Sequence, residues 1–456
     1  MLSSATPDMG ILPAAHSLRQ ILNDEVHSRP TEALWPSERV FHMALTGKPS
    51  MLASWGRHIA SLASAFRVKG LDYIDWHAPQ ISLVLVEGDN ALRLRFERHN
   101  EFVSVTLFER ADDSLVFDRS AVRRLPVPWL TDAPGELLVS VNLALRQVEQ
   151  ADQPESAAVH FEGHTLVGGT IASGAGQVFT DFHIYPADQS TRILVNNLGM
   201  GSRQAGRMVQ RLLEIETYRM MALLSFPVAK SAIPRLSRAE QALVRITSEM
   251  AKRNDEYPLE SAREAELEVD ARLLTGLTNL ASDVEDLSAA TRVRFTAAAA
   301  YHDLVDKRIA ELREQRLDGV QTWGEFMERR LGPAIRTCAW TARRQSELSE
   351  RIARITQLLR TRVEIEREAQ NQRLLSSMDM RAQLQLRLQQ TVEGLSVVAI
   401  TYYSVGLVSY LAKSLKVLGL GIDPDIAVVV SIPLVGFAAW QAIRTVRRHI
   451  ASQPEL

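Results

Sequence analysis

The chain has very little cysteine and no excess of basic charge. Its 456 residues include one cysteine, Cys338, which excludes an intramolecular disulfide and fits a reducing compartment. The 52 Lys and Arg residues are balanced by 54 Asp and Glu, for a formal net charge of −2, whereas nucleic-acid binders usually show a basic excess. We therefore expect no nucleic acid among its partners.

The motifs of common enzyme frameworks are missing as well. The sequence contains neither C-x-x-C nor G-x-S-x-G. The glycine-rich stretch GMGSRQAG, with Gly199, Gly201 and Gly206, matches neither the dinucleotide-binding loop nor the P-loop, so ordinary turn glycines are expected. The start of the chain lacks the basic stretch and apolar run of a signal peptide, so none is expected. We predict a protein that is not an enzyme and has no cofactor.

Two long apolar runs near the C-terminus are the most informative feature that is present. Leu395–Ala412 and Ile426–Ile443 are each eighteen residues without charge, and thirteen residues, 413–425, separate them. A bilayer core about 30 Å thick is crossed by a helix of roughly 18–20 residues. The runs therefore predict two transmembrane helices, at about 393–412 and 426–443, within a segment 391–456. Buried core helices of a soluble domain are the alternative.

The charges that flank the apolar runs predict an orientation. Arg381 and Arg387 precede the first run, a basic tail with Arg444, Arg447 and Arg448 follows the second, and the linker carries two lysines. Because basic residues favour the cytoplasmic side, both termini are expected in the cytoplasm, at the bacterial inner membrane.

Residues 1–200 have the pattern of an α/β cytoplasmic head. Short alternating runs at 81–88, 91–98 and 101–110, separated by turn residues, predict an antiparallel meander. Residues 55–68 show helical spacing and are expected to pack on the sheet. Further strands are expected in GELLVSVNLAL, where a helix is the alternative, and in HTLVGGTIA, GQVFTDFHIYP and TRILVNNLG.

From 201 to 390 the apolar period becomes helical. A second helix is expected to open at Ser237 and Glu240, which have capping-box spacing. Residues that favour helices are then almost uninterrupted over 322–390, and a break in the helix is expected at Gly332-Pro333. The helices expected before this stretch are 204–226, 236–253, 259–281 and 287–315.

A short apolar seam lies within this last stretch. Leu348, Ile352, Ile355 and Leu359 follow the 4-3-4 spacing of a coiled coil, which predicts a long stalk helix shielded by neighbours or by identical copies. The fold class expected is an α+β cytoplasmic head, an all-α region with this stalk, and a C-terminal two-helix transmembrane hairpin.

Several segments resemble a known family. They are NDEVHSRPTEALWP, LRFERHNEFVSVTLF, GRMVQRLLEIETYRMMAL and the long stretch LLRTRVEIEREAQNQRLLSSMDMRAQLQLRLQQTVEGLSVVAITYYSVGLVSYL. On these segments the chain resembles domain of unknown function family 3422, a bacterial family of membrane-anchored proteins. The resemblance implies a membrane location and no defined activity.

The layout is also similar to that of CorA-type magnesium channels. RLLEIETYR and the stretch from Arg360 to Leu411 are similar in pattern to the stalk and first span of that superfamily, whose pentamers line a pore with their first spans. The Gly-Met-Asn filter of those channels does not occur in this chain, and Ser409-Tyr410-Leu411 stands in its place. Cation selectivity is therefore not carried over.

Polar residues near the start of the chain form one candidate site. Glu25, His27, Arg29 and His42 combine a carboxylate, two imidazoles and a guanidinium, which suits acid–base chemistry or anion binding. The alternative is an irregular segment whose polar groups tie down a loop. His160 and His164 form H-x-x-x-H, but Gly163 and the strand-like flanks argue against the helix that a metal pair at this spacing needs. The metal ligands are left undecided.

Small and hydroxyl residues mark a second candidate site in the first apolar run. Thr401, Ser404, Gly406 and Ser409 are expected to line a pore or to pack helices together, and packing is the commoner use. The leading hypothesis is a non-enzymatic membrane-anchored homo-oligomer with a cytoplasmic sensing or binding head. Its partners are the lipid bilayer, further copies of itself, and an unidentified ion or small ligand. A CorA-like channel with a divergent filter is the alternative.

Overall fold

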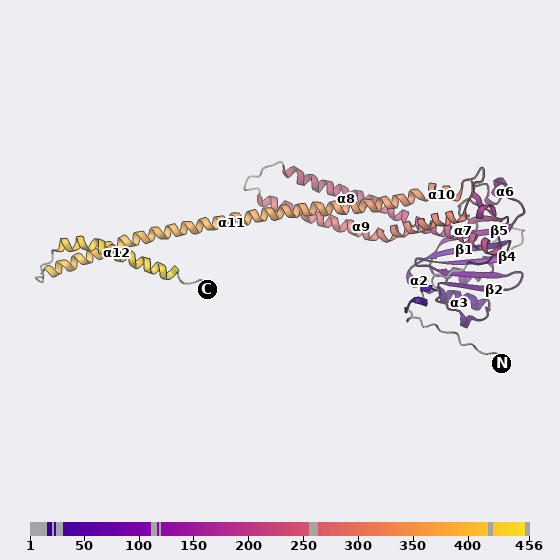
Figure 1. Ribbon diagram of the computed structural model, residues 1–456, viewed down its shortest axis with the longest axis horizontal. Coiled ribbons are helices and arrows are strands. Elements are labelled where there is room, and N and C mark those ends of the chain that lie inside the picture. The colour runs from indigo at the N-terminus through magenta and orange to yellow at the C-terminus, as the bar shows by residue number, and fades with distance from the viewer. Residues whose placement is uncertain are drawn as a thin grey trace, which may run out of the picture. The chain divides into compact units, whose positions relative to one another are not determined.

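The computed structural model describes residues 16–20, 22–23, 31–110, 116–117, 120–254, 263–417 and 423–451. They belong to two compact units. The first consists of Met1–Tyr257 and Thr275–Arg354, and the second of Pro258–Leu274 and Ile355–Leu456. The chain thus has an N-terminal α/β sheet domain followed by a mostly helical region with long helices (Figure 1).

Eight strands of the described residues form one sheet in the order β2-β3-β4-β1-β5-β8-β7-β6. All neighbouring strands are antiparallel except β5 and β8, which are parallel. The expected meander is confirmed as β2-β3-β4, and GELLVSVNLAL is a strand. The strands are β1 (Glu38–Thr46), β2 (Gln80–Val86), β3 (Leu92–Arg98), β4 (Phe102–Arg110), β5 (Glu136–Gln147), β6 (Val167–Ile171), β7 (Gly176–Thr180) and β8 (Thr191–Asn197).

The sequence did not predict β1, although this strand lies between β4 and β5 near the middle of the sheet. Nearly all of its side chains are buried, so its sequence, ERVFHMALT, lacks the alternation of a strand with one wet face. Phe41 and Met43 point to one core, whereas Val40 and Ala44 point to the other. When both faces of a strand are covered, apolar and polar residues need not alternate, so the sequence lacks the period of two that predicts a strand.

Helices cover both faces of this sheet. On one face, Trp55, Ile59 and Leu62 of α3 pack against Phe41 and Met43, which confirms the expected packing of residues 55–68. On the other face lies α7, whose apolar side chains join the core that includes Val40 and Ala44. The helices of the sheet domain are α2 (Pro49–Ala53), α3 (Trp55–Ala65), η1 (Leu71–Tyr73), α4 (Ser120–Arg123), α5 (Val127–Thr131), α6 (Pro154–Ala158), η2 (Val159–Phe161), η3 (Ala172–Gly174) and α7 (Ser202–Leu223).

The helical region differs from expectation at two places. The helix expected to open at Ser237 begins at Ser225 and continues through Pro234, because the burial of Ala229, Ala232 and Leu236 offsets the cost of the proline. In place of the two helices expected at 259–281 and 287–315, the described residues form one helix, Arg263–Leu312. The break at Gly332-Pro333 is confirmed. These helices are α8 (Ser225–Asn254), α9 (Arg263–Leu312), α10 (Trp323–Arg330), α11 (Gly332–Val417) and α12 (Pro424–Ala451).

Within the first unit, α8, α9 and the start of α11 lie side by side (Figure 1). Ala229, Phe295 and Cys338, one from each helix, form a small buried cluster, and burial raises the pKa of the Cys338 thiol. Arg344 of α11 forms an ion pair with Glu240 of α8 at 2.5 Å. The seam residues Leu348 and Ile352 are buried within this single chain.

The second unit contains the remainder of α9 and α11 together with α12. Arg362 of α11 lies 3.8 Å from Asp270 of α9. By length and composition, α11 and α12 are each apolar enough over part of their length to cross a membrane. The two helices approach closely where Gly436 faces Thr401, since a Cβ on Gly436 would lie 3.8 Å from Thr401 Cγ2.

Gly206 allows the segment before β1 to cross α7. A Cβ built at Gly206 would lie 1.8 Å from the carbonyl oxygen of Glu32, and Leu34 donates its N–H to the Ser202 carbonyl at 3.1 Å beside it. Alanine favours a helix over glycine by about 1 kcal/mol, so any loss of stability on substitution must come from the steric clash.

We expect Gly206→Ala to lower the free energy of unfolding by about 1–3 kcal/mol, as overpacking does. Thermal and urea unfolding of the purified protein will measure this. Gly199→Ala is the matched control, because a Cβ there has no atom within 4 Å. Equal stability of the two variants would contradict the close approach.

Candidate functional site

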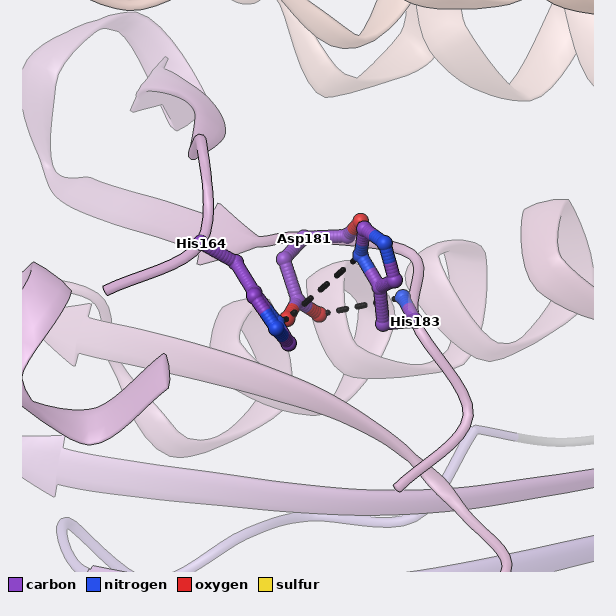
Figure 2. A group of neighbouring side chains, drawn as sticks. All are labelled: His164, Asp181 and His183. Atoms are coloured by element: carbon purple, nitrogen blue, oxygen red, sulfur yellow. Dashed lines mark hydrogen bonds and ion pairs between the residues drawn. The ribbon is translucent and has the colours of Figure 1, made fainter. Parts of the chain in front are cut away.

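Two histidines and an aspartate meet at one end of the β6–β7 hairpin. Val167 at the start of β6 pairs with Thr180 at the end of β7. Residues just before β6 and just after β7 therefore come together, and these are His164, Asp181 and His183 (Figure 2). We refer to these three residues as the histidine–aspartate cluster.

The side chains of the cluster are in direct contact. Nδ1 of His164 lies 2.7 Å from Oδ2 of Asp181, and Nδ1 of His183 lies 3.8 Å from the same oxygen. The two imidazole rings have centroids 4.4 Å apart. One donor atom from each residue can be chosen so that all three lie within 4.8 Å of one another.

The backbone at Phe182 turns the side chain of this residue away from those of Asp181 and His183. Phe182 has φ +55°, in the left-handed region that a bulky residue rarely adopts. Its ring stacks on Phe326 and meets Trp323 edge-on, so the core holds it in place. Asp181 and His183 then both belong to the cluster, and the backbone N–H of His183 donates to Oδ1 of Asp181 at 3.1 Å. Strain of this kind is typical of ligand-binding positions.

Tyr185 is the next residue in contact with the cluster. Its hydroxyl donates to Oδ2 of Asp181 at 2.5 Å. Burial, followed by the hydrogen bond to Asp181, raises the pKa of Tyr185. The guanidinium of Arg192 lies over the Tyr185 ring, with Cζ 3.6 Å from the centroid, but its ion pairs are with Asp188 and Glu162.

Asp181 is a buried carboxylate whose described ion-pair partners are both histidines. Its side chain is 0 % exposed, while those of His164 and His183 are 38 % and 62 % exposed. Among the residues that the structure describes, its ion-pair partners are these two histidines, with no lysine or arginine. A buried carboxylate is costly unless it is paired with a cation or strongly hydrogen-bonded.

The H-x-x-x-H pair of the sequence is not brought together as a site. His164 belongs to the cluster, but His160 lies in η2 with its ring edge-on to Phe117. The sequence reasoning missed Asp181, His183 and Tyr185. The signal that finds them is D-F-H-x-Y directly after the strand GQVFT, read together with the register of the β6–β7 hairpin.

The first candidate site of the sequence is only partly placed. Glu25, His27 and Arg29 lie outside the described residues, so their grouping stays a prediction. His42 is buried on β1, with Nδ1 2.8 Å from Thr106 Oγ1 and Nε2 3.0 Å from Thr217 Oγ1. The cavity beside it measures about 20 Å³, room for about one water molecule.

The second candidate site lies in the apolar part of α11. Thr401, Ser404, Gly406 and Ser409 are all half-buried. Thr401, Gly406 and Ser409 line a groove of about 970 Å³, together with Val428 and Ile432 of α12. The Thr401 hydroxyl donates to the Val397 carbonyl at 2.7 Å, one turn back in its own helix.

Comparison with known families identifies the chain. Residues 14–450 match the family described as "Protein of unknown function (DUF3422)", in agreement with the resemblance of the sequence segments. The chain belongs to this family. No curated protein matches it.

The environment of His42 predicts a pH-dependent stability. Burial lowers the pKa of His42 to about 4; the Glu97 carboxylate opposes this shift, while Arg95 and His99 add to it. In the unfolded chain a histidine titrates near 6.5. Between about pH 6.5 and 4 the unfolded state therefore binds the proton first, and stability falls as the pH falls.

We expect protonation of this histidine in the unfolded chain to lower the free energy of unfolding by about 3 kcal/mol as the pH falls from 6.5 to 4. His42→Gln keeps hydrogen-bonding capacity but does not titrate, so its stability will depend less on pH than that of the wild type. Urea unfolding at a series of pH values checks this, with His77→Gln on the exposed surface as the control. Parallel curves for wild type and His42→Gln would contradict the buried neutral imidazole.

Proposed function

We propose that the chain is a non-enzymatic integral membrane protein. Its C-terminal helix pair anchors it in the bacterial inner membrane, and its α/β sheet domain is a cytoplasmic sensing or binding head. The proposal includes self-association into a homo-oligomer through the long helix α11, which acts as a stalk.

The observation that carries the anchoring proposal is the exposure of apolar side chains on α11 and α12. Leu395 is 72 % and Val429 67 % exposed, and tyrosines, leucines and valines around them are similarly uncovered. Exposed apolar surface costs roughly 25 cal/mol per Å² in water, and a lipid bilayer removes that cost. The alternative of buried core helices requires a covering layer, and the described residues of the second unit provide none on these faces.

Residues at the ends of the apolar runs agree with an interfacial position. Trp440 lies near the end of the second run, and the Arg444 guanidinium lies 5.0 Å from its ring centroid. Tryptophan and arginine are typical of the boundary between hydrocarbon and water on the cytoplasmic side. Asp423 and Asp425 stand at the opposite end of α12, on the linker that we place outside.

Self-association is supported by an exposed segment of α11. From Asn371 to Gln390 every residue is exposed, including apolar side chains that water does not favour. They are Leu374, Leu375, Met378, Met380, Leu384, Leu386 and Leu388. Identical copies of the helix would cover them, as in a helical bundle.

The CorA-like channel remains the second candidate, and the hydroxyls of the first apolar run bear on it. Ser396 and Thr401 donate to carbonyls one turn back in α11, at 2.8 and 2.7 Å, and a Cβ on Gly436 of α12 would lie 3.8 Å from Thr401 Cγ2. The two hydroxyls donate within their own helix and α12 comes close beside Thr401, which favours helix packing over a water-filled lumen. Gly-Met-Asn is absent from the chain.

Truncation tests the anchor. We expect the full-length chain to stay in the membrane fraction after an alkaline carbonate wash, and a chain ending at Gln390 to be released. A charged residue in the middle of a span costs roughly 3 kcal/mol, so Val405→Asp combined with Leu434→Asp should reduce retention. Ser376→Asp with Ser377→Asp, on α11 but outside both apolar runs, is the matched control. A full-length chain in the soluble fraction would remove the anchoring proposal.

The number of subunits separates the two candidate functions. We expect native mass spectrometry of the full-length protein in detergent to show an oligomer of fewer than five identical chains. Five chains would favour the channel, whose pore is built from five first spans. A monomer would contradict self-association and the pore alike.

A further inference from the structure

We infer that His164, Asp181 and His183 bind a divalent first-row transition metal, and that zinc is the ion they fit best. The inference gives the proposed binding head a ligand and rests on that part of the proposed function. It does not depend on the membrane anchor, because every residue involved belongs to the sheet domain.

The donor set is the first argument. Imidazole nitrogens suit zinc, copper, iron and nickel, whereas magnesium prefers an octahedron of oxygen ligands. Two histidines and one carboxylate are a common three-residue zinc set, with the fourth position left to water or another ligand. The composition of the cluster therefore selects a transition metal against magnesium.

The spacing of the donors is the second argument. Tetrahedral zinc, with bonds of about 2.0–2.1 Å, places neighbouring ligand atoms roughly 3.3 Å apart. In the cluster, His164 Nδ1 and Asp181 Oδ2 are 2.7 Å apart, and all three donor atoms lie within 4.8 Å. Shifts of roughly 1.5 Å or less would bring the three donor atoms to the spacing of a zinc site. The half-exposed His164 and the exposed His183 have room to make these shifts.

Charge is the third argument. Oδ2 of Asp181 is buried, and no lysine or arginine of the described residues forms an ion pair with it. A divalent cation supplies the missing countercharge. The alternative is an ion pair between His164 and Asp181 without any metal, and titration with zinc separates these two cases.

Hydrogen bonds already orient the ligands. Oδ1 of Asp181 accepts from the backbone N–H of His183, and Oδ2 accepts from the Tyr185 hydroxyl. Nδ1 of His183 lies 2.9 Å from the carbonyl oxygen of Asp181 and 3.8 Å from its Oδ2, so this nitrogen faces the other two donors (Figure 2). Outer groups of this kind fix ligand orientation and tune affinity in metal sites.

The test is metal titration of the full-length protein in detergent, purified without a polyhistidine tag and stripped with a chelator. We expect calorimetry to show one zinc ion per chain, and cobalt to give the visible absorption of a low-coordinate site. Excess magnesium should not compete. His164→Ala and His183→Ala should each weaken zinc binding at least roughly tenfold, and Tyr185→Phe by about 10- to 100-fold.

His160→Ala is the matched control, because His160 lies four residues before His164 in the sequence but outside the cluster. It should bind zinc as the wild type does. His183→Ala removes an exposed side chain, so its circular dichroism should match that of the wild type. No stoichiometric zinc in the wild type, or equal affinity of the two cluster variants and the control, would overturn the inference. Membrane retention of the same samples reports on the anchor separately, so either proposal can fail alone.

Discussion

The sheet domain depends on the burial of β1 on both faces. This strand pairs with β4 on one side and β5 on the other, and so joins the antiparallel meander to the second half of the sheet. Its alternate side chains belong to two separate cores, one closed by α3 and the other by α7. Because both cores include β1, a change in its register by one residue would exchange their side chains and disrupt both.

The parallel pairing of β5 with β8 then determines where the histidine–aspartate cluster forms. Two parallel neighbours need a long connection between them, and here that connection contains β6 and β7. The β6–β7 hairpin extends the sheet beyond β8, with Thr180 of β7 paired with both Val167 and Ile193. The end of β7 is therefore fixed next to the start of β6, which is the juxtaposition that brings Asp181 to His164.

Much of the fold could be predicted where local pattern and tertiary environment agree. The strand β2 alternates because one of its faces is exposed, and β4 alternates because Ser104 and Thr106 stand between apolar residues although both faces are buried. Gly332-Pro333 interrupts a helix for steric reasons that need no tertiary contact. Prediction failed where packing overrides local preference. The strand β1 has no alternation, and Pro234 lies inside α8 because buried neighbours hold the helix together.

The sequence predicted only part of the candidate site, because the contacts of this site also depend on tertiary structure. H-x-x-x-H drew attention to His164 but supplied the wrong partner, since a pair at that spacing shares a face only in a helix. The true partners follow a different strand, and their proximity depends on hairpin register. Two imidazoles and one buried carboxylate suit a softer ion than magnesium, so the proposed metal site rests on the donor set of the cluster and not on a likeness to magnesium channels.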